Sequence, residues 1–170
     1  MSPRAGALLD ALDTHRATVS ARLDALPDAV VHRRPSPGAW SLAQLAEHLA
    51  RVDAGLRLDG PPLSAAGRAT SWLRSRGVQG VLSLPIRIPA PPSAAHILPS
   101  AAPRWPEVRE RWAAVRVGWR RATPDPDSAA FAHPLAGPFA WADALAFLLA
   151  HHRHHDAQIR RILAAVAPER

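Results

Sequence analysis

The stretch "SLAQLAEHLARVDAGL", residues 41–56, shows a helix start and an amphipathic pattern more clearly than any other part of the chain. Ser41 is a good N-terminal cap, and Gln44 three residues later completes a capping box. The apolar residues that follow recur at spacings of three and four, the periodicity of one helix face. They are Leu42, Leu45, Leu49, Val52 and Leu56. The stretch therefore predicts a helix that buries one side, with His48 at the edge of that side.

The same periodicity predicts three further helices, over residues 4–26, 105–123 and 139–167. The helix at 105–123 carries a stripe of tryptophans, which we interpret as core rather than as a surface for stacking bases. No segment shows the alternation of apolar and polar residues that is typical of a strand. Four amphipathic helices, each too short to be stable alone, predict an all-α fold, an antiparallel up-down four-helix bundle.

A long proline-rich connection, residues 59–104, separates the second and third predicted helices. Residues 59–106 hold nine of the 18 prolines. We expect a short helix over residues 64–76 and an extended loop over the rest. Connections of this length often serve as lids or binding loops. The length of 170 residues predicts a single domain over residues 1–170.

Composition restricts the classes of function. The chain has no cysteine, which excludes disulfides, thiolate metal sites and a cysteine nucleophile. All 21 basic residues are arginines, and they are spread along the chain without a recognisable nucleic-acid module, so the net charge of +7 does not indicate a nucleic-acid partner. The longest apolar run, residues 144–150, is far shorter than the roughly 18 residues that a membrane span needs. We expect a soluble, cytoplasmic protein with no membrane partner.

Four histidines lie within five positions in "LLAHHRHHDAQIRRIL", residues 148–163, on the last predicted helix. By periodicity, His155 and His152 lie on its apolar side, His151 lies at the edge of that side, and His154 points away. Two histidines four residues apart on a helix can hold a divalent ion. The pattern identifies His155 as inward-facing and leaves its partner open between His151 and His152.

Two ligands from one helix need a third ligand from elsewhere. His48 is the natural candidate, and His15, on the apolar stripe of the first predicted helix, is its rival. Two simpler interpretations remain beside the metal site. A single buried histidine is usually satisfied by a hydrogen bond, and a run of histidines can be a solvated helix surface.

Three motifs resemble those of the DinB-like (damage-inducible) superfamily of bacterial four-helix proteins. They are "GAWSLAQLAEHL" at residues 38–49, "HPLAGPFAWADALAFLLAHH" at 133–152 and "HHRHHDAQIRRIL" at 151–163. The order of all four predicted helices agrees with that family, whereas residues 59–104 carry no recognisable part of it. Ala140 departs from the family pattern, because a Ser or Thr cap is common at that position.

The resemblance implies a three-histidine site for a divalent metal. In the family a histidine follows the "WS" helix start, and the last helix carries two histidines four residues apart with a glutamine three residues later. These positions are His48, His151 and His155 here, with Gln158 as the glutamine. The resemblance thus selects His151 rather than His152 as the partner of His155. It also implies a homodimer.

The resemblance implies an activity as well. Members of the superfamily include transferases and isomerases that depend on small thiols such as bacillithiol and mycothiol. A metal-dependent thiol S-transferase, or a hydrolase, is therefore the expected enzyme, and the thiol must be a small molecule because the chain has no cysteine. The alternative is a non-catalytic, metal-binding, stress-associated protein. Imidazole ligands suit several ions, of which zinc or nickel is our first choice. Asp53 and Asp156 are candidates for holding the ligand imidazoles. They are equally interpreted as ordinary surface acids, which is the interpretation we favour for Asp156.

Overall fold

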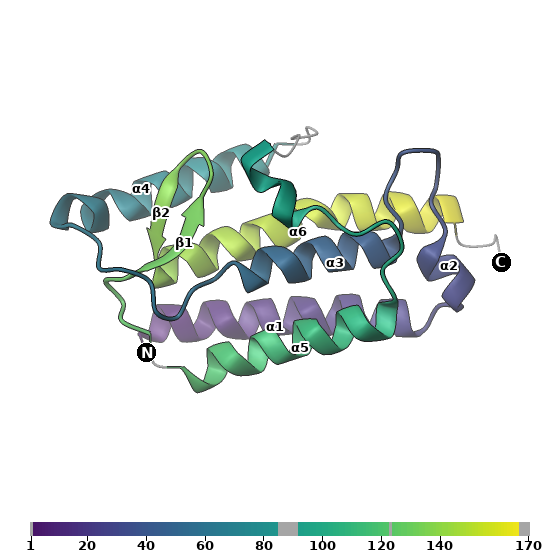
Figure 1. Ribbon diagram of the computed structural model, residues 1–170, viewed down its shortest axis with the longest axis horizontal. Helices are drawn as coiled ribbons and strands as arrows, with labels where there is room; N and C mark the ends of the chain where they lie inside the picture. Colours follow the sequence, from purple (N-terminus) through teal and green to yellow (C-terminus); the bar gives the residue numbers. More distant parts are fainter. Residues whose placement is uncertain (1, 85–91, 123, 167–170) are drawn as a thin grey trace.

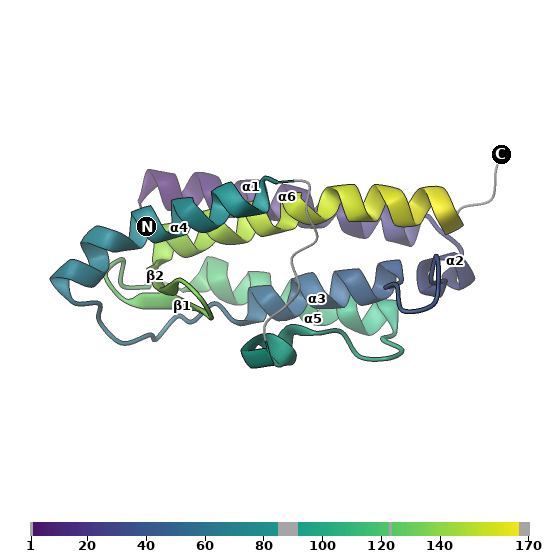
Figure 2. The same ribbon diagram turned by 90° about the horizontal axis from the view of Figure 1, so that it is seen from above.

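The structure is a computed structural model that describes residues 2–84, 92–122 and 124–166. It is mostly helical, with 68% helix and a small two-stranded sheet, so the all-α expectation is confirmed in its main part. Four helices correspond to the predicted ones and lie alongside one another (Figures 1 and 2). They are α1 (Pro3–Asp24), α3 (Leu42–Ala54), α5 (Trp105–Arg121) and α6 (Trp141–Val166). Their antiparallel up-down order stays a prediction, and so does the single domain.

Helix α3 begins as its sequence predicts. The Gln44 backbone N–H donates to Ser41 Oγ at 3.2 Å, and the Ser41 backbone N–H donates to Gln44 Oε1 at 3.1 Å. These two bonds satisfy free amides of the first turn, which is the stabilising effect of a capping box. Almost every side chain of α3 is buried, because α5, α6 and neighbouring segments pack around it. The helix is therefore central rather than one-sided, and this places His48 in the interior.

The tryptophans of α5 belong to the core, as predicted. Trp105, Trp112 and Trp119 are all buried. The indole N–H groups of two of them reach carboxylates: Trp105 Nε1 donates to Asp24 at 2.8 Å, and Trp112 Nε1 donates to Asp53 at 2.7 Å. A buried indole usually needs such a partner for its one polar group. The stripe therefore joins α5 to α1 and α3.

The proline-rich connection contains more helix than predicted. The expected helix over residues 64–76 begins correctly, with Ser64 Oγ accepting the Gly67 N–H at 3.0 Å, but α4 (Ala65–Leu82) continues well beyond residue 76. A 3-10 helix, η1 (Pro92–Ile97), follows. Part of the predicted extended loop, residues 85–91, lies outside the described residues.

Helix α4 is longer than predicted because the side chains that it buries fully are serines, while its Val78 and Leu82 pack on the core only partly buried. Ser71 Oγ donates to Asp143 Oδ2 and Ser75 Oγ donates to the Asp143 carbonyl, both at 2.8 Å. These contacts fix α4 on α6, while Trp72 and Leu73 point outward and are exposed. A helix that buries small polar residues shows a weak apolar period, so its length cannot be read from that period.

A β-hairpin precedes α6, where the sequence predicts no strand. Strand β1 (Ala129–His133) pairs antiparallel with β2 (Gly137–Ala140), and Phe131 lies opposite Phe139. The prediction was wrong because strands this short carry little alternation. Phe139 and Ala140 belong to β2 rather than to the last helix. Ala140 offers no side-chain cap, but its backbone N–H donates to Ser71 Oγ at 2.8 Å.

The remaining described elements are minor. Helix α2 (Asp28–His32) is a single short turn between α1 and α3. None of the helices in the described ranges combines the length and the apolar character needed to cross a bilayer.

Candidate metal centre

Helices α3 and α6 bring three histidines together. His48 projects from α3, and His151 and His155 project from successive turns of α6, which packs directly on α3. His151 Nε2 lies 3.3 Å from His48 Nε2 and 3.2 Å from His155 Nε2. One ring nitrogen of each residue lies within 4.8 Å of the other two. Three imidazoles from two helices thus point their Nε2 atoms at a common centre.

The outer ring nitrogens of two of these histidines are held by oxygen acceptors. His48 Nδ1 donates to the Ile97 carbonyl at 2.9 Å, and His155 Nδ1 donates to Gln158 Oε1 at 2.9 Å. A carbonyl oxygen can only accept, so the proton of a neutral ring must be on Nδ1. The Nε2 lone pairs of His48 and His155 therefore face the centre. Histidines that bind metals are usually oriented in this way.

His151 is the deepest member of the cluster. Its Nδ1 is buried and has no hydrogen-bond partner among the described residues. Its Nε2 is within hydrogen-bonding distance of both other Nε2 atoms, yet a single proton can serve only one of them. Hydrogen bonds among the three rings therefore cannot give every Nε2 atom a partner.

Burial keeps the three imidazoles neutral. Desolvation is the main cause that lowers the pKa of His48, lowers the pKa of His151 well below its usual value and lowers the pKa of His155 to about 3. Neighbouring histidines add repulsion, and no described carboxylate pairs with the three rings. Neutral imidazole is the form that binds a metal ion, so the protein presents these ligands ready for binding at neutral pH.

The geometry fits a divalent ion. When the His151 proton is on Nδ1, three lone pairs meet at one point and repel one another unless a cation lies between them. Tetrahedral zinc with Zn–N bonds of about 2.0–2.1 Å holds its nitrogens about 3.3 Å apart. The observed separations of 3.2 and 3.3 Å agree with this value. The donor set, the orientation of His48 and His155, and these two separations therefore suit a metal, and the third pair of ligand nitrogens lies within 4.8 Å.

His152 is adjacent to His151 in the sequence but lies in a different environment. It is completely buried, and its Nε2 donates to Asp53 Oδ1 at 2.9 Å. The other oxygen of Asp53 accepts the Trp112 indole N–H at 2.7 Å. The Asp53 side chain thus joins α3 to both α5 and α6 through two buried hydrogen bonds.

His15 continues this second network toward the surface. Its Nδ1 lies 3.3 Å from His152 Nδ1, and its Nε2 lies 2.8 Å from Asp156 Oδ1. Burial lowers the pKa of His15 and Asp156 partly opposes that effect. The structure thus brings together His48, His151 and His155, and it places His152 and His15 elsewhere.

The carboxylates proposed to hold ligand imidazoles do not do so. Asp53 binds His152 and Asp156 binds His15, whereas the ligand candidates are oriented by Ile97 and Gln158. The position of Gln158 was visible in the sequence. The Ile97 contact was not, because any residue can supply a backbone carbonyl and η1 gives no clear sequence signal.

Comparison with known proteins adds a family to this geometry. The model of the DinB superfamily matches residues 11–159. The chain belongs to the DinB superfamily. No curated protein and no solved structure matches it. DinB superfamily members bind metal, and the histidine cluster found here could hold an ion. The ligand roles of the individual histidines remain a prediction.

Proposed function

We propose that this DinB-superfamily protein binds one divalent metal ion through the Nε2 atoms of His48, His151 and His155. One observation carries the proposal: three buried, neutral imidazoles converge, and acceptor oxygens fix the outer nitrogens of two of them. Zinc or nickel is the expected ion, because imidazole ligands suit both.

We further propose that the site is catalytic. Three protein ligands leave coordination positions open, and a divalent ion there lowers the pKa of a bound water or thiol. The chain itself orients the imidazoles through Ile97 and Gln158, and burial restricts the access of bulk water to the rings. These are the features expected of a pre-organised reaction site.

A metal-dependent thiol S-transferase is the reaction class we favour. The chain has no cysteine, so the sulfur nucleophile must come from a small-molecule thiol. In such a reaction the thiol gives its proton to water and its sulfur forms a bond to an electrophilic carbon. The bond from that carbon to the leaving group breaks, and the leaving group departs with the electron pair. The superfamily to which the chain belongs includes thiol-dependent transferases, and this supports the class. The second candidate is a non-catalytic protein that holds the same ion. We also propose that the protein forms a homodimer.

Metal analysis of purified variants tests the binding proposal. His48→Ala, His151→Ala and His155→Ala should each lose the ion, whereas the wild type should contain an equimolar amount. His154→Ala is the matched control, since it lies on the same helix and its Nδ1 donates to the Leu82 carbonyl instead. Unchanged metal content in the three variants would refute the site.

Turnover distinguishes the two candidate functions. The metal-loaded protein is mixed with bacillithiol or mycothiol and a chromogenic electrophile, and the rate of thioether formation is measured. The transferase proposal predicts a rate above the uncatalysed reaction that disappears on chelation and in His155→Ala. A stoichiometrically loaded protein that gives no rate above background with either thiol favours the non-catalytic candidate.

A further inference from the structure

Glu47 is a buried carboxylate on α3, directly before the ligand candidate His48. Its side chain is only 3% exposed. A carboxylate in the interior costs free energy unless hydrogen bonds and opposite charges compensate it. The partners of Glu47 therefore show which part of the chain this side chain holds in place.

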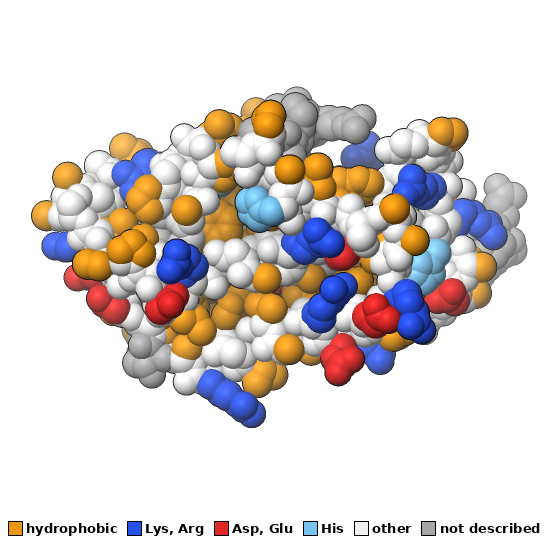
Figure 3. Space-filling view, in the orientation of Figure 1, with side chains coloured by type: hydrophobic (Ala, Val, Ile, Leu, Met, Phe, Trp, Pro, Cys, Tyr) orange, Lys and Arg blue, Asp and Glu red, His pale blue; other side chains and the backbone are white. Residues whose placement is uncertain are grey.

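One oxygen of Glu47 is paired with arginines. Arg51 Nη2 donates to Oε1 at 2.9 Å, and Arg111 Nη2 lies 3.6 Å from the same oxygen. These arginines project from α3 and α5, over which basic and acidic side chains lie next to each other (Figure 3). Arg51 and Arg111 are 38% and 64% exposed, so solvent weakens both ion pairs. Arg51 also donates to the His96 carbonyl at 3.4 Å.

The other oxygen of Glu47 holds the chain that follows η1. Glu47 Oε2 accepts the Ser100 backbone N–H at 2.7 Å and the Ser100 hydroxyl at 2.8 Å. Gln44, three residues earlier on α3, donates to the Ser100 carbonyl at 2.9 Å and to the Ala101 carbonyl at 3.2 Å. Side chains of α3 therefore anchor Ser100 on both sides of its backbone.

The anchored residue lies close in the chain to the group that orients His48. The Ile97 carbonyl accepts the hydrogen bond from His48 Nδ1 at 2.9 Å, and only three residues separate Ile97 from Ser100. So short a connection restricts the Ile97 carbonyl to positions near the anchored Ser100. The hydrogen bonds of Glu47 thus lead, through Ser100 and Ile97, to the outer nitrogen of a ligand candidate.

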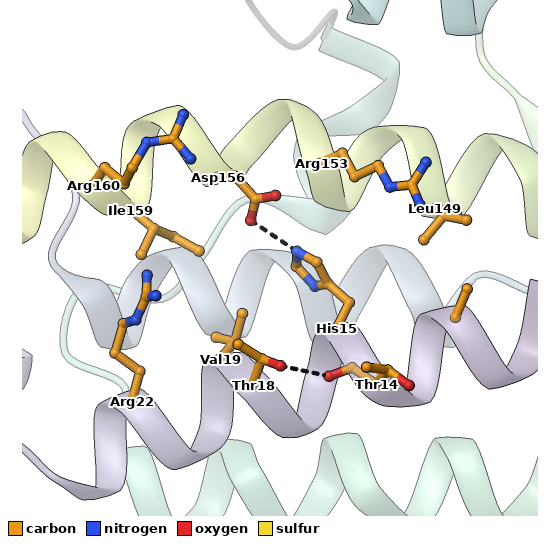
Figure 4. Close-up of a pocket in the computed structure, with 11 residues that line it drawn as sticks. Thr14, His15, Thr18, Val19, Arg22, Leu149, Arg153, Asp156, Ile159 and Arg160 are labelled. Atoms are coloured by element: carbon orange, nitrogen blue, oxygen red, sulfur yellow. Dashed lines mark hydrogen bonds and ion pairs between the residues drawn. The ribbon is translucent and has the colours of Figure 1, made fainter.

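Two other carboxylates near the histidines have different partners. Asp53 accepts a hydrogen bond from His152, and Asp156 contacts His15 beside the groove between α1 and α6 (Figure 4). Both contacts serve histidines outside the cluster of three. Of these three carboxylates, Glu47 is the one whose hydrogen bonds lead to the cluster.

We propose that Glu47 is a positioning residue of the metal centre. It holds Ser100, and Ser100 fixes the path of the chain to Ile97. The Ile97 carbonyl then keeps the proton of His48 on Nδ1 and the Nε2 lone pair directed at the ion. The inference rests on the proposed metal function, and it concerns the orientation of one ligand.

Nitrogen NMR of the histidine rings tests this positioning in metal-free protein. The chemical shifts of the two ring nitrogens show which of them carries the proton. We expect His48 of the wild type to be protonated on Nδ1 and His48 of Glu47→Gln to show a mixture of both tautomers. An amide cannot accept from Ser100 without turning its own N–H groups toward the arginines. His155 is the internal control, because Gln158 holds its Nδ1 proton independently of Glu47.

Chelator competition then measures the consequence for the ion. Glu47→Gln should weaken metal affinity about tenfold, the lower end of the usual effect of residues that orient metal ligands. Glu107→Gln is the matched control, since the same substitution there removes a 55% exposed carboxylate paired with Arg104. It should leave the His48 tautomer and the metal affinity as they are in the wild type.

Ser100→Ala keeps the buried carboxylate and removes one of its two hydrogen bonds to the segment, so it serves if Glu47→Gln does not fold. It should change the His48 signals in the same direction and to a smaller extent. Wild-type His48 signals in the folded variants, equal changes in His48 and His155, or wild-type metal affinity in Glu47→Gln would each overturn the proposal. Absence of metal binding by the wild type would refute the metal function, whereas the tautomer of His48 is measured without metal.

Discussion

His151 and His152 are adjacent in the sequence and both are buried, yet their surroundings give them different chemistry. His152 donates to the carboxylate of Asp53, which also binds Trp112, so its Nε2 is used in a structural hydrogen bond. The Nε2 atom of His151 lies next to the Nε2 atoms of His48 and His155, and its Nδ1 has no partner among the described residues. A carboxylate acceptor gives His152 a structural role. His151 has no carboxylate acceptor in the described part of the chain, so it keeps a lone pair available for a cation.

The largest effect on metal affinity should come from replacing one of these two histidines, His151, by alanine. His151→Ala should lower metal affinity about a thousandfold, because structural zinc sites gain about 10–16 kcal/mol from all their ligands together. The variant should stay folded, since it removes no hydrogen bond to a carboxylate. Competition with a chromogenic chelator measures the affinity.

His152→Ala should give the reverse result, with lower stability and near-normal metal affinity in the folded protein. Urea denaturation measures the stability and chelator competition the affinity. Loss of metal in His152→Ala with retention in His151→Ala would mean that the two histidines have been assigned the wrong roles.

Acidification should destabilise the metal-free protein. The pKa of His155 is about 3 in the folded state against an ordinary value of 6.5, so folding favours the neutral ring. This stabilisation is complete above about pH 6.5 and is lost as pH falls toward 3, by about 3 kcal/mol or more. Urea denaturation in chelator at pH 7 and pH 4 measures the loss. His155→Gln, which cannot titrate, should show a smaller loss, and an equal loss in the variant would contradict this cause.

Removal of the Asp53 carboxylate tests the structural role that the comparison assigns to His152. Asp53→Ala leaves the Trp112 indole and the His152 imidazole without partners in the interior. We expect a fall of about 2–3 kcal/mol in the free energy of unfolding. Asp156→Ala is the control and should cost less than about 1 kcal/mol, because its carboxylate is 38% exposed. Similar costs for the two variants would show that the buried network is not the stabilising feature.

The smallest effect should come from removing the hydrogen bond to the outer ring nitrogen, Nδ1, of His155. Gln158→Ala removes the acceptor that orients His155 and should weaken metal affinity about tenfold. Stability should change little, since Gln158 is half-buried at the edge of the bundle. Chelator competition distinguishes this result from a wild-type affinity, which would show that the imidazole is held by packing alone.

The sequence predicted the main helices because their buried faces carry large apolar residues at regular spacing. The α3 capping box and the buried tryptophans of α5 follow directly from that pattern. It did not predict the full length of α4, which packs through Ser71 and Ser75, or the short hairpin before α6. Small polar contacts and short strands leave too little periodicity to detect.

For the site, periodicity identified His155 as inward-facing but could not choose between His151 and His152. A helix places both near its buried side, and the choice depends on the neighbours that other helices supply. Asp53 on α3 accepts a hydrogen bond from His152, and His48, five residues earlier on α3, contacts His151. Spacing within one helix contains no information about those partners, whereas the family resemblance selected His151.

Anomalous diffraction at the absorption edge of the bound metal, from crystals of the metal-loaded protein, tests the central claim most directly. We predict one peak per chain at about 2.0–2.1 Å from the Nε2 atoms of His48, His151 and His155. A peak bound instead by His152 or His15, or metal-loaded crystals with no peak between α3 and α6, would contradict the account.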